Sequence, residues 1–315
     1  MKYYTTVLIH FIYAKPMTDT QRVAVGRIVR EHMPEGYRNA EAAARAMCDH
    51  KRVRYRRDPD RTNALLDLLA AEGLSTDTWE IIEFEAHEIA SSPLAFFSST
   101  VEVPEVWCLA EELYDFSTGC QACTTGAVQK RALRFRPSDL KDPSRQLVVT
   151  HVPYQPLVSC RLIAAIGTDC NMSEYVRPIE DRCGRVIPEW SQMCATRTLP
   201  RLSNSTKEFG REEDACPTCR RDGFGVPWGK AFEPVLAAEQ GRELARASDP
   251  WFATWEYFGC IGNRPRDKPR LVPPQPDFVL GKRAIEYLAG LKLRHLSLIP
   301  VQFEHADGRL SFSPE

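Results

Sequence analysis

The sequence lacks an excess of charge of either sign, since it holds 41 basic and 42 acidic residues and has a formal net charge of −1. Proteins that bind along a nucleic-acid backbone usually carry a clear basic excess, so the balance argues against that class for the chain as a whole. No hydrophobic run is long enough to span a bilayer, because the apolar start of the chain is short and is broken by His10. No small-residue cleavage site follows that run, which predicts a cytoplasmic protein with no membrane contact.

Recognisable catalytic motifs are also missing. The sequence contains neither a phosphate-binding P-loop nor a dinucleotide-binding glycine motif, and the glycines of residues 220–225 are expected to form a turn. The seven histidines are scattered, and no Ser-His-Asp or Cys-His-Asn arrangement can be assigned among them. We therefore nominate no catalytic residue and expect a non-catalytic protein, with an enzyme whose site is not recognisable as an alternative.

The chain of 315 residues, 43% of them hydrophobic, is long enough to bury a substantial core. Helical and strand patterns are mixed without regular alternation, which predicts an α+β fold. Residues 1–100 are expected to form an N-terminal α+β module. Its predicted elements are strands at 2–13 and from 78, helices following Asp19, from residue 40 and at 62–74, and a solvated connection at 51–61.

Residues 101–315 have a different sequence pattern, which indicates short strands, many turns and few clear helices. Strands are expected around the Pro-Ser-Asp turn at residues 137–139, and a last strand is expected at 294–305. Strand-to-helix units are expected at 156–167 and 277–293, and a helix at 233–247. Residues 171–215 are difficult to assign from their pattern, with short extended pieces the best interpretation.

Eleven cysteines is a high number, and an odd number in a chain without a secretory signal does not indicate a disulfide framework. Two Cys-x-x-Cys pairs stand out, Cys120-Gln-Ala-Cys123 and Cys216-Pro-Thr-Cys219. In such a zinc knuckle both thiolates bind one metal ion, while backbone amides of the tight turn hydrogen-bond the sulfurs. Together the four thiolates predict one tetrahedral, structural Zn²⁺ site.

The separation of the two pairs leaves alternatives open. Ordinary zinc ribbons separate their pairs by roughly 15–20 residues, whereas about ninety residues intervene here, so a folded insertion must return the chain to the first knuckle. Two separate mixed sites could instead recruit Cys170, Cys183, Cys194 or a histidine. A thiol–disulfide motif is less favoured, because the residues after each pair indicate turns and not a helix N-terminus. Unliganded cysteines are the remaining possibility.

Two parts of the chain resemble each other. In each, a Cys-x-x-Cys pair is followed by a short apolar strand, a small residue and a helix, and the small residues are Ser159 and Gly281. This predicts that residues 101–315 form a pseudo-duplicated, zinc-ribbon-containing α+β half, in which each copy contributes one knuckle.

Other cysteines and the tryptophans are expected to be structural. Cys48, Cys108, Cys160 and Cys260 lie in apolar sequence and are expected to behave as small buried hydrophobic residues. Trp190, Trp228, Trp251 and Trp255 are expected to cover a loop-rich core, with exposure at a partner-binding face as the alternative.

Parts of the chain resemble a group of bacterial double Cys-x-x-Cys-Gly proteins of uncharacterised activity. The resembling parts are the two knuckles and the segments at 87–97, 112–135, 156–166, 255–259 and 277–301. The resemblance covers roughly residues 80–300. Thr124 and Arg220 depart from it, because the group usually has glycine directly after the second cysteine of each pair.

The C-terminal strand–helix–strand unit is similar to one in immunity proteins of bacterial polymorphic toxin systems. The resemblance therefore implies a non-catalytic protein that binds a protein partner, a cognate toxin, and neutralises it. A nucleic-acid-associated zinc-ribbon protein is the alternative. Its support is the basic run at 51–57 and the arginines near the knuckles, which are Arg131, Arg134, Arg136, Arg220 and Arg221.

Overall fold

The computed structural model describes residues 2–10, 20, 23–24, 27–28, 31, 51–56, 59–73, 75–104, 110–140, 142–150, 155–167, 170–206, 216–221, 223–224, 232–258 and 275–315. The chain divides into two compact units, the first comprising Met1–Glu85 with Pro227–Phe232 and the second Ala86–Val226 with Glu233–Glu315. The fold is mixed α+β, as the sequence predicts. Within the part of the chain that the structure describes, no helix is long and apolar enough to cross a membrane.

The first unit contains an antiparallel sheet of β1 (Lys2–His10), β2 (Lys51–Arg56) and β3 (Ser75–Glu83) in the order β2-β1-β3. Helix α3 (Pro59–Ala71) buries Leu65 and Leu69 completely. It begins three residues before the predicted Thr62, at a proline whose fixed φ suits a first helical turn. The predicted solvated connection at 51–61 is wrong, because its first six residues form β2. The helix predicted from residue 40 lies outside the described residues.

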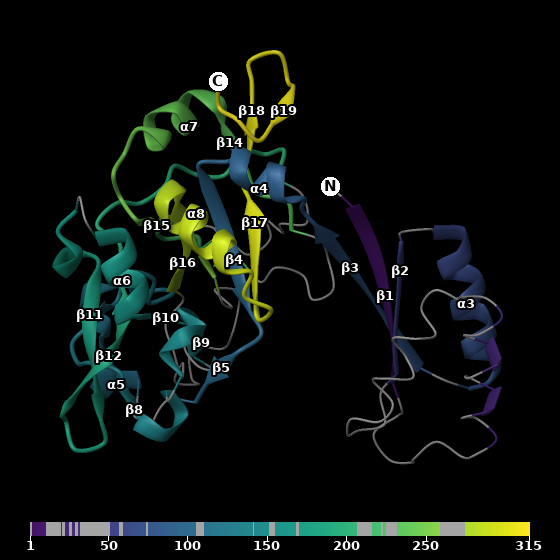
Figure 1. Cartoon of the computed structure of the whole chain (residues 1–315), viewed down its shortest axis with the longest axis horizontal. Helices are drawn as coiled ribbons and strands as arrows, with labels where there is room; N and C mark the ends of the chain where they lie inside the picture. The colour runs from purple at the N-terminus through teal and green to yellow at the C-terminus, as the bar shows by residue number, and fades with distance from the viewer. Residues whose placement is uncertain are drawn as a thin grey trace. The chain divides into compact units, whose positions relative to one another are not determined.

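The second unit is built on two larger sheets (Figure 1). The first has six strands in the order β5-β9-β10-β12-β11-β8, with bounds β5 Glu102–Val103, β8 Arg134–Phe135, β9 Leu147–Thr150, β10 Pro156–Ser159, β11 Val176–Asp181 and β12 Val186–Met193. The second has five strands in the order β13-β15-β16-β4-β17, with bounds β4 Leu94–Ser99, β13 Gly223–Phe224, β15 Trp251–Phe258, β16 Gln275–Gly281 and β17 Leu296–Pro300.

The two sheets share one pattern of strand directions. A parallel edge pair, β5-β9 or β13-β15, is followed by three antiparallel pairs, through β10-β12-β11 in one sheet and β16-β4-β17 in the other. The last residue of each middle strand makes the same contact: the Ser159 amide donates to Gln146 O and the Gly281 amide to Pro250 O, both at 2.8 Å. Each acceptor immediately precedes the neighbouring strand. The two predicted strand-to-helix units therefore occupy equivalent positions in their sheets.

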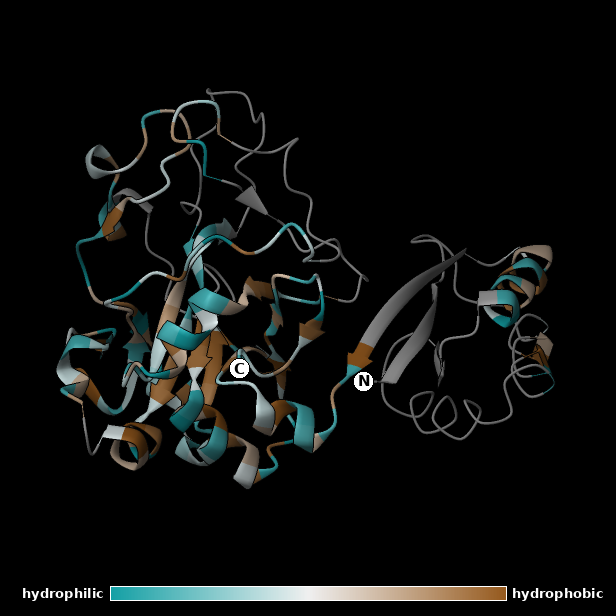
Figure 2. Cartoon of the chain, turned by 90° about the horizontal axis from the view of Figure 1, so that it is seen from above, coloured by the Kyte–Doolittle hydropathy of each residue, from teal (hydrophilic) through white to brown (hydrophobic). Residues whose placement is uncertain are grey.

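In both strand-to-helix segments the strand continues into a helix, and the two helices share one core. Helices α6 (Cys160–Ile166) and α8 (Lys282–Leu291) pack on each other, and their Leu162 and Ile285 lie in a cluster with Val149 and Leu280 from the two sheets, all at most 1% exposed. In Figure 2 the strands at the centre of this unit are largely brown, whereas the helices around them carry teal, polar faces.

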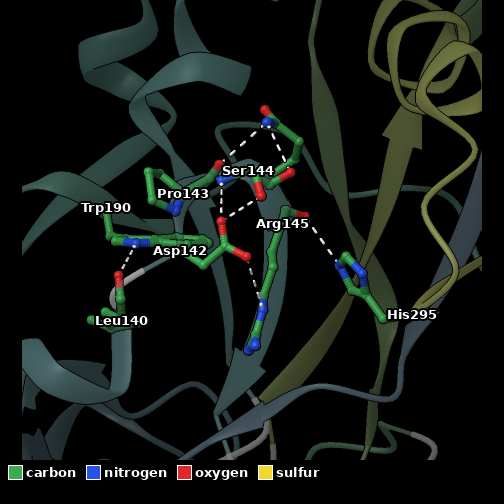
Figure 3. A network of polar contacts seen from close by, with 8 residues as sticks. Leu140, Asp142, Pro143, Ser144, Arg145, Trp190 and His295 are labelled. Atoms are coloured by element: carbon green, nitrogen blue, oxygen red, sulfur yellow. Dashed lines mark hydrogen bonds and ion pairs between the residues drawn. The ribbon is translucent and has the colours of Figure 1, made fainter.

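A second core lies on the six-stranded sheet and is closed by a loop of short 3-10 turns. The Trp190 ring is 2% exposed, and its indole Nε1 donates to Leu140 O at 2.8 Å (Figure 3). In the next turn Arg145 O and His295 Nε2 are 3.1 Å apart. A carbonyl can only accept, so the imidazole carries its proton on Nε2, and this bond links the loop before β17 to the first sheet.

The remaining elements are small. They are α4 (Ala86–Ser91), α5 (Ala110–Leu113), β6 (Tyr114–Asp115), β7 (Val128–Gln129), β14 (Val235–Ala237), α7 (Ala238–Ala245), β18 (Gln302–Glu304), β19 (Leu310–Ser311) and the 3-10 turns at Phe116–Thr118, Pro137–Leu140, Pro143–Arg145 and Met172–Glu174. Two expectations need correction. The helix predicted at 233–247 begins only at Ala238, because 235–237 form β14, and residues 223–224, predicted as a turn, form β13.

Candidate metal centre

The first Cys-x-x-Cys pair lies in the loop of the β6–β7 hairpin. The Thr124 amide donates to Cys120 O at 2.7 Å and the Cys120 amide donates to Thr125 O at 2.9 Å, which closes a tight turn around the two cysteines. Gly119 lies where this turn folds back, and a Cβ there would be 2.6 Å from Thr124 O. Only glycine permits that backbone approach.

The second pair forms the same turn. The Arg220 amide donates to Cys216 O at 2.8 Å and the Cys216 amide donates to Arg221 O at 3.1 Å. The residue after the second cysteine has a left-handed backbone in both turns, with φ 61° at Thr124 and 55° at Arg220. The chain leaves the second turn through β13, which pairs in parallel with β15, so this knuckle is attached to the edge of the five-stranded sheet.

The two turns bring all four sulfurs together. The Sγ atoms of Cys120, Cys123, Cys216 and Cys219 lie within 4.8 Å of one another. Two of the separations between the knuckles are 3.8 Å for Cys120–Cys216 and 3.6 Å for Cys123–Cys219. A metal bound tetrahedrally by thiolates at about 2.3 Å holds its sulfurs about 3.8 Å apart, whereas a disulfide needs about 2.05 Å. The spacing fits four ligands of one metal ion and does not fit disulfides.

The cluster is shielded by protein. Cys123 and Cys216 are each 2% exposed, Cys120 and Cys219 are partly exposed, and Tyr257 packs against the group. A four-coordinate ion at its centre would have protein sulfur at every position. Such a closed donor set is typical of structural sites, since catalytic metal sites keep a position open for water or substrate.

The thiols influence one another electrostatically. Burial raises the pKa of Cys123, and hydrogen bonding with Thr125 opposes this only in part. Burial and the neighbouring thiols raise the pKa of Cys219 to about 12. Burial acts on Cys216 in the same direction, but amide donors at Cys219 and Thr218 and the adjacent sulfurs outweigh it and lower the pKa to about 7. In such a cluster the first thiolate suppresses ionisation of the next, and a divalent cation reverses that effect.

Among the described residues, this cysteine quartet is the group with metal-ligand geometry. Cys170, Cys183 and Cys194, considered for mixed sites, do not join it. Cys160, expected to be buried, is exposed at the first position of α6. Cys48, Cys108 and Cys260 lie outside the described residues.

The basic and aromatic residues near the knuckles have distinct surroundings. Arg134 Nε lies 3.4 Å from Glu180, and Arg131 lies 4.0 Å from Glu112. Trp190 and Trp251 are buried as expected, although in different clusters. Trp255 is partly exposed and lies beside Arg221, a contact between residues 34 positions apart that the sequence pattern does not predict. Trp228 lies outside the described residues.

One serine–histidine contact has the residue types of a catalytic nucleophile and its base. His305 Nε2 and Ser311 Oγ are 2.8 Å apart in the β18–β19 hairpin. The Ser311 hydroxyl donates its single proton to Ser313 O, so the imidazole N–H donates to the hydroxyl and cannot accept its proton. A nucleophilic serine needs the opposite arrangement. The contact therefore stabilises the hairpin.

No protein-family model matches this chain, and no curated protein or solved structure was found to be similar to it. The geometry of the cysteine cluster is accordingly the principal structural observation that bears on function.

Proposed function

We propose that Cys120, Cys123, Cys216 and Cys219 bind one structural Zn²⁺ ion that clasps the β6–β7 hairpin to the edge of the five-stranded sheet. The observation that carries this proposal is that four sulfurs from two identically closed knuckles lie within 4.8 Å of one another. Thiolate-only tetrahedral sites select zinc or iron, and zinc suits a site whose role is to hold two segments together.

We further propose that the protein is a cytoplasmic, non-catalytic immunity protein that binds a bacterial toxin and neutralises it. The resemblance at residues 80–300 to double Cys-x-x-Cys-Gly proteins, and that of the C-terminal strand–helix–strand unit to immunity proteins, supports this role. The closed donor set adds support, because a metal surrounded by four thiolates offers no position for a substrate. Free thiols throughout the described residues agree with a reducing compartment.

Metal analysis of purified variants tests the shared site. Wild type should carry one zinc per chain, and Cys120→Ser and Cys216→Ser should each lose it, because one ion needs ligands from both knuckles. Cys183→Ser, which removes an exposed thiol outside the cluster, is the matched control and should keep the metal. Full zinc in either knuckle variant would exclude a shared site.

Growth protection tests the immunity role. The product of the gene adjacent to the one for this chain should arrest growth of a host cell, and co-expression of wild type should restore growth. The two proteins should co-purify. Cys216→Ser should protect less at equal expression, whereas Cys183→Ser should protect fully. Absence of both co-purification and protection would refute the role.

A further inference from the structure

A stack of arginine and aromatic side chains adjoins the second knuckle. The Arg221 guanidinium carbon lies 5.1 Å from the ring centroids of both Trp255 and Tyr257, and Arg201 lies 5.5 Å from the Trp255 ring. Trp255 and Tyr257 are two residues apart on β15, and both are partly exposed. We refer to Arg201, Trp255, Arg221 and Tyr257 as the arginine–aromatic stack.

The knuckle holds this stack in place. Arg221 O accepts the Cys216 amide that closes the metal-binding turn, and Arg221 Nη1 donates to Trp255 O at 2.5 Å. Tyr257 contacts both the guanidinium and the cysteine cluster. On the other side, the Leu202 amide donates to the buried carboxylate of Glu256 at 2.7 Å, which positions the neighbouring Arg201. The stack therefore depends on the same turn that binds the metal.

The charge of the knuckle arginines is not neutralised by the part of the chain that the structure describes. Arg197, for comparison, forms ion pairs with Asp249 at 3.2 Å and with Glu243 at 3.3 Å. For Arg220 and Arg221, by contrast, no described carboxylate lies within 4.0 Å. Arg221 Nη1 donates to Trp255 O, and stacking on the rings leaves the Nε–Nη2 edge of the guanidinium for a bidentate carboxylate contact.

We propose that the arginine–aromatic stack is a docking surface for an acidic segment of a partner protein, formed only when the knuckle holds its metal. The proposal rests on the protein-binding role proposed above and adds the surface and the chemistry that it recognises. Arginine, tryptophan and tyrosine dominate the binding energy of protein interfaces, and their fixed arrangement here lowers the entropy lost on binding. The charge of Arg221, which no described carboxylate neutralises, selects carboxylates.

Fluorescence anisotropy with a labelled polyglutamate peptide tests the surface on the intact, zinc-loaded chain, with polyglutamine of equal length as the uncharged control. Polyglutamate should bind and polyglutamine should not. Arg221→Gln should weaken polyglutamate binding about tenfold, and Arg221→Lys, which keeps the charge but not the planar fork, should fall between. Arg246→Gln removes an exposed arginine at the end of α7 and should bind as wild type does.

Zinc content and unfolding midpoint of each variant establish that the fold is intact, and Trp255→Phe is a second variant that keeps an aromatic face. Removing the metal by chelation should abolish polyglutamate binding. Equal binding by wild type, Arg221→Gln and Arg246→Gln would overturn the proposal. Tighter binding of a polyuridylate strand than of polyglutamate would also overturn it, because the surface would then recognise nucleic acid.

The growth-protection experiment separates this proposal from the immunity role. If Arg221→Gln loses polyglutamate binding but still protects fully, the stack is not the docking surface and the immunity role stands. If wild type binds polyglutamate through Arg221 but never protects, the immunity role fails and the acidic docking surface stands.

Discussion

Thr124 and Arg220 have the backbone conformation that L-amino acids adopt least readily. Each has a positive φ and each donates its amide to the carbonyl of the first cysteine in its knuckle. A left-handed conformation costs an L-residue roughly 1–2 kcal/mol, and a β-branched threonine is especially unfavourable there. Glycine adopts a positive φ without this cost, so the backbone alone favours glycine at both positions.

Thr124→Gly and Arg220→Gly should therefore stabilise the metal-bound protein. Relief of backbone strain exceeds the entropic cost of glycine, so we expect each to gain roughly 0.5–1 kcal/mol in denaturant unfolding. Gly126→Ala is the opposite control, because Gly126 has φ 85° and no neighbour within 4 Å of an added Cβ. It should lose about 1 kcal/mol through strain alone. Unchanged stability in both glycine variants would contradict the argument.

Metal affinity should decrease as the pH is lowered, because protons and the metal compete for the same sulfurs. The raised pKa of Cys123 and the pKa of about 12 at Cys219 mean that both thiols are protonated at neutral pH until metal displaces their protons. The stability that the metal supplies is thus present at neutral and alkaline pH and is lost as pH falls. Displacement of at least these two protons makes the apparent affinity change at least about hundredfold per pH unit.

Competition with a chromogenic chelator between about pH 6 and pH 8 measures this dependence. Calorimetric titration in buffers of different ionisation enthalpy counts the protons released. An affinity independent of pH over that range would show that the thiols are already ionised before metal binds.

At the scale of elements, local sequence predicted the units whose pattern is continuous along the chain. The segments at 156–166 and 277–291 form a strand and a helix as expected, and the small residues at their junctions have separate reasons. Ser159 Oγ accepts the Leu162 amide and caps α6. Gly281 lies against Asp249 O, which would be 2.5 Å from a Cβ.

Elements stabilised by distant partners were not predictable in the same way. β14 is three residues long and exists because it pairs with β18, more than sixty positions away in sequence. β2 looked like a charged connection because four of its six residues are basic, yet it pairs along β1. Periodicity within a short window carries no information about such partners.

Two glycines associated with α8 provide a matched test of close packing. Gly281→Ala should destabilise the protein by more than about 1 kcal/mol, because its Cβ meets backbone atoms that cannot move independently. Gly290 lies within the same helix with nothing within 4 Å of an added Cβ. Gly290→Ala should therefore gain about 0.5–1 kcal/mol from helix propensity. Thermal or denaturant unfolding gives both values, and equal effects would refute the packing argument.

At the scale of the whole molecule, the sequence predicted that the cysteine pairs would meet across a long separation. They do meet, with partner sulfurs 96 positions apart. The duplication inferred from the sequence stays a prediction, which the matching strand directions of the two sheets support. The fourth strand of each pattern is β12 in one sheet and β4 in the other. Local repeats could not predict that β12 follows α6 in the chain whereas β4 lies far before α8.

Removal of the metal should act on the second unit and leave the first unit unchanged. The clasp joins the β6–β7 hairpin to the β13–β15 edge, and both belong to the second unit. After chelation, amides of the hairpin and of β15 should exchange hydrogen at least about tenfold faster, because local opening there no longer breaks metal–sulfur bonds. Amides of β1 and β3 should exchange at their original rates. Peptide-resolved hydrogen exchange with and without chelator measures this, and re-addition of zinc should restore protection. Uniform acceleration in both units would mean that the metal stabilises the chain globally and does not act as a local clasp.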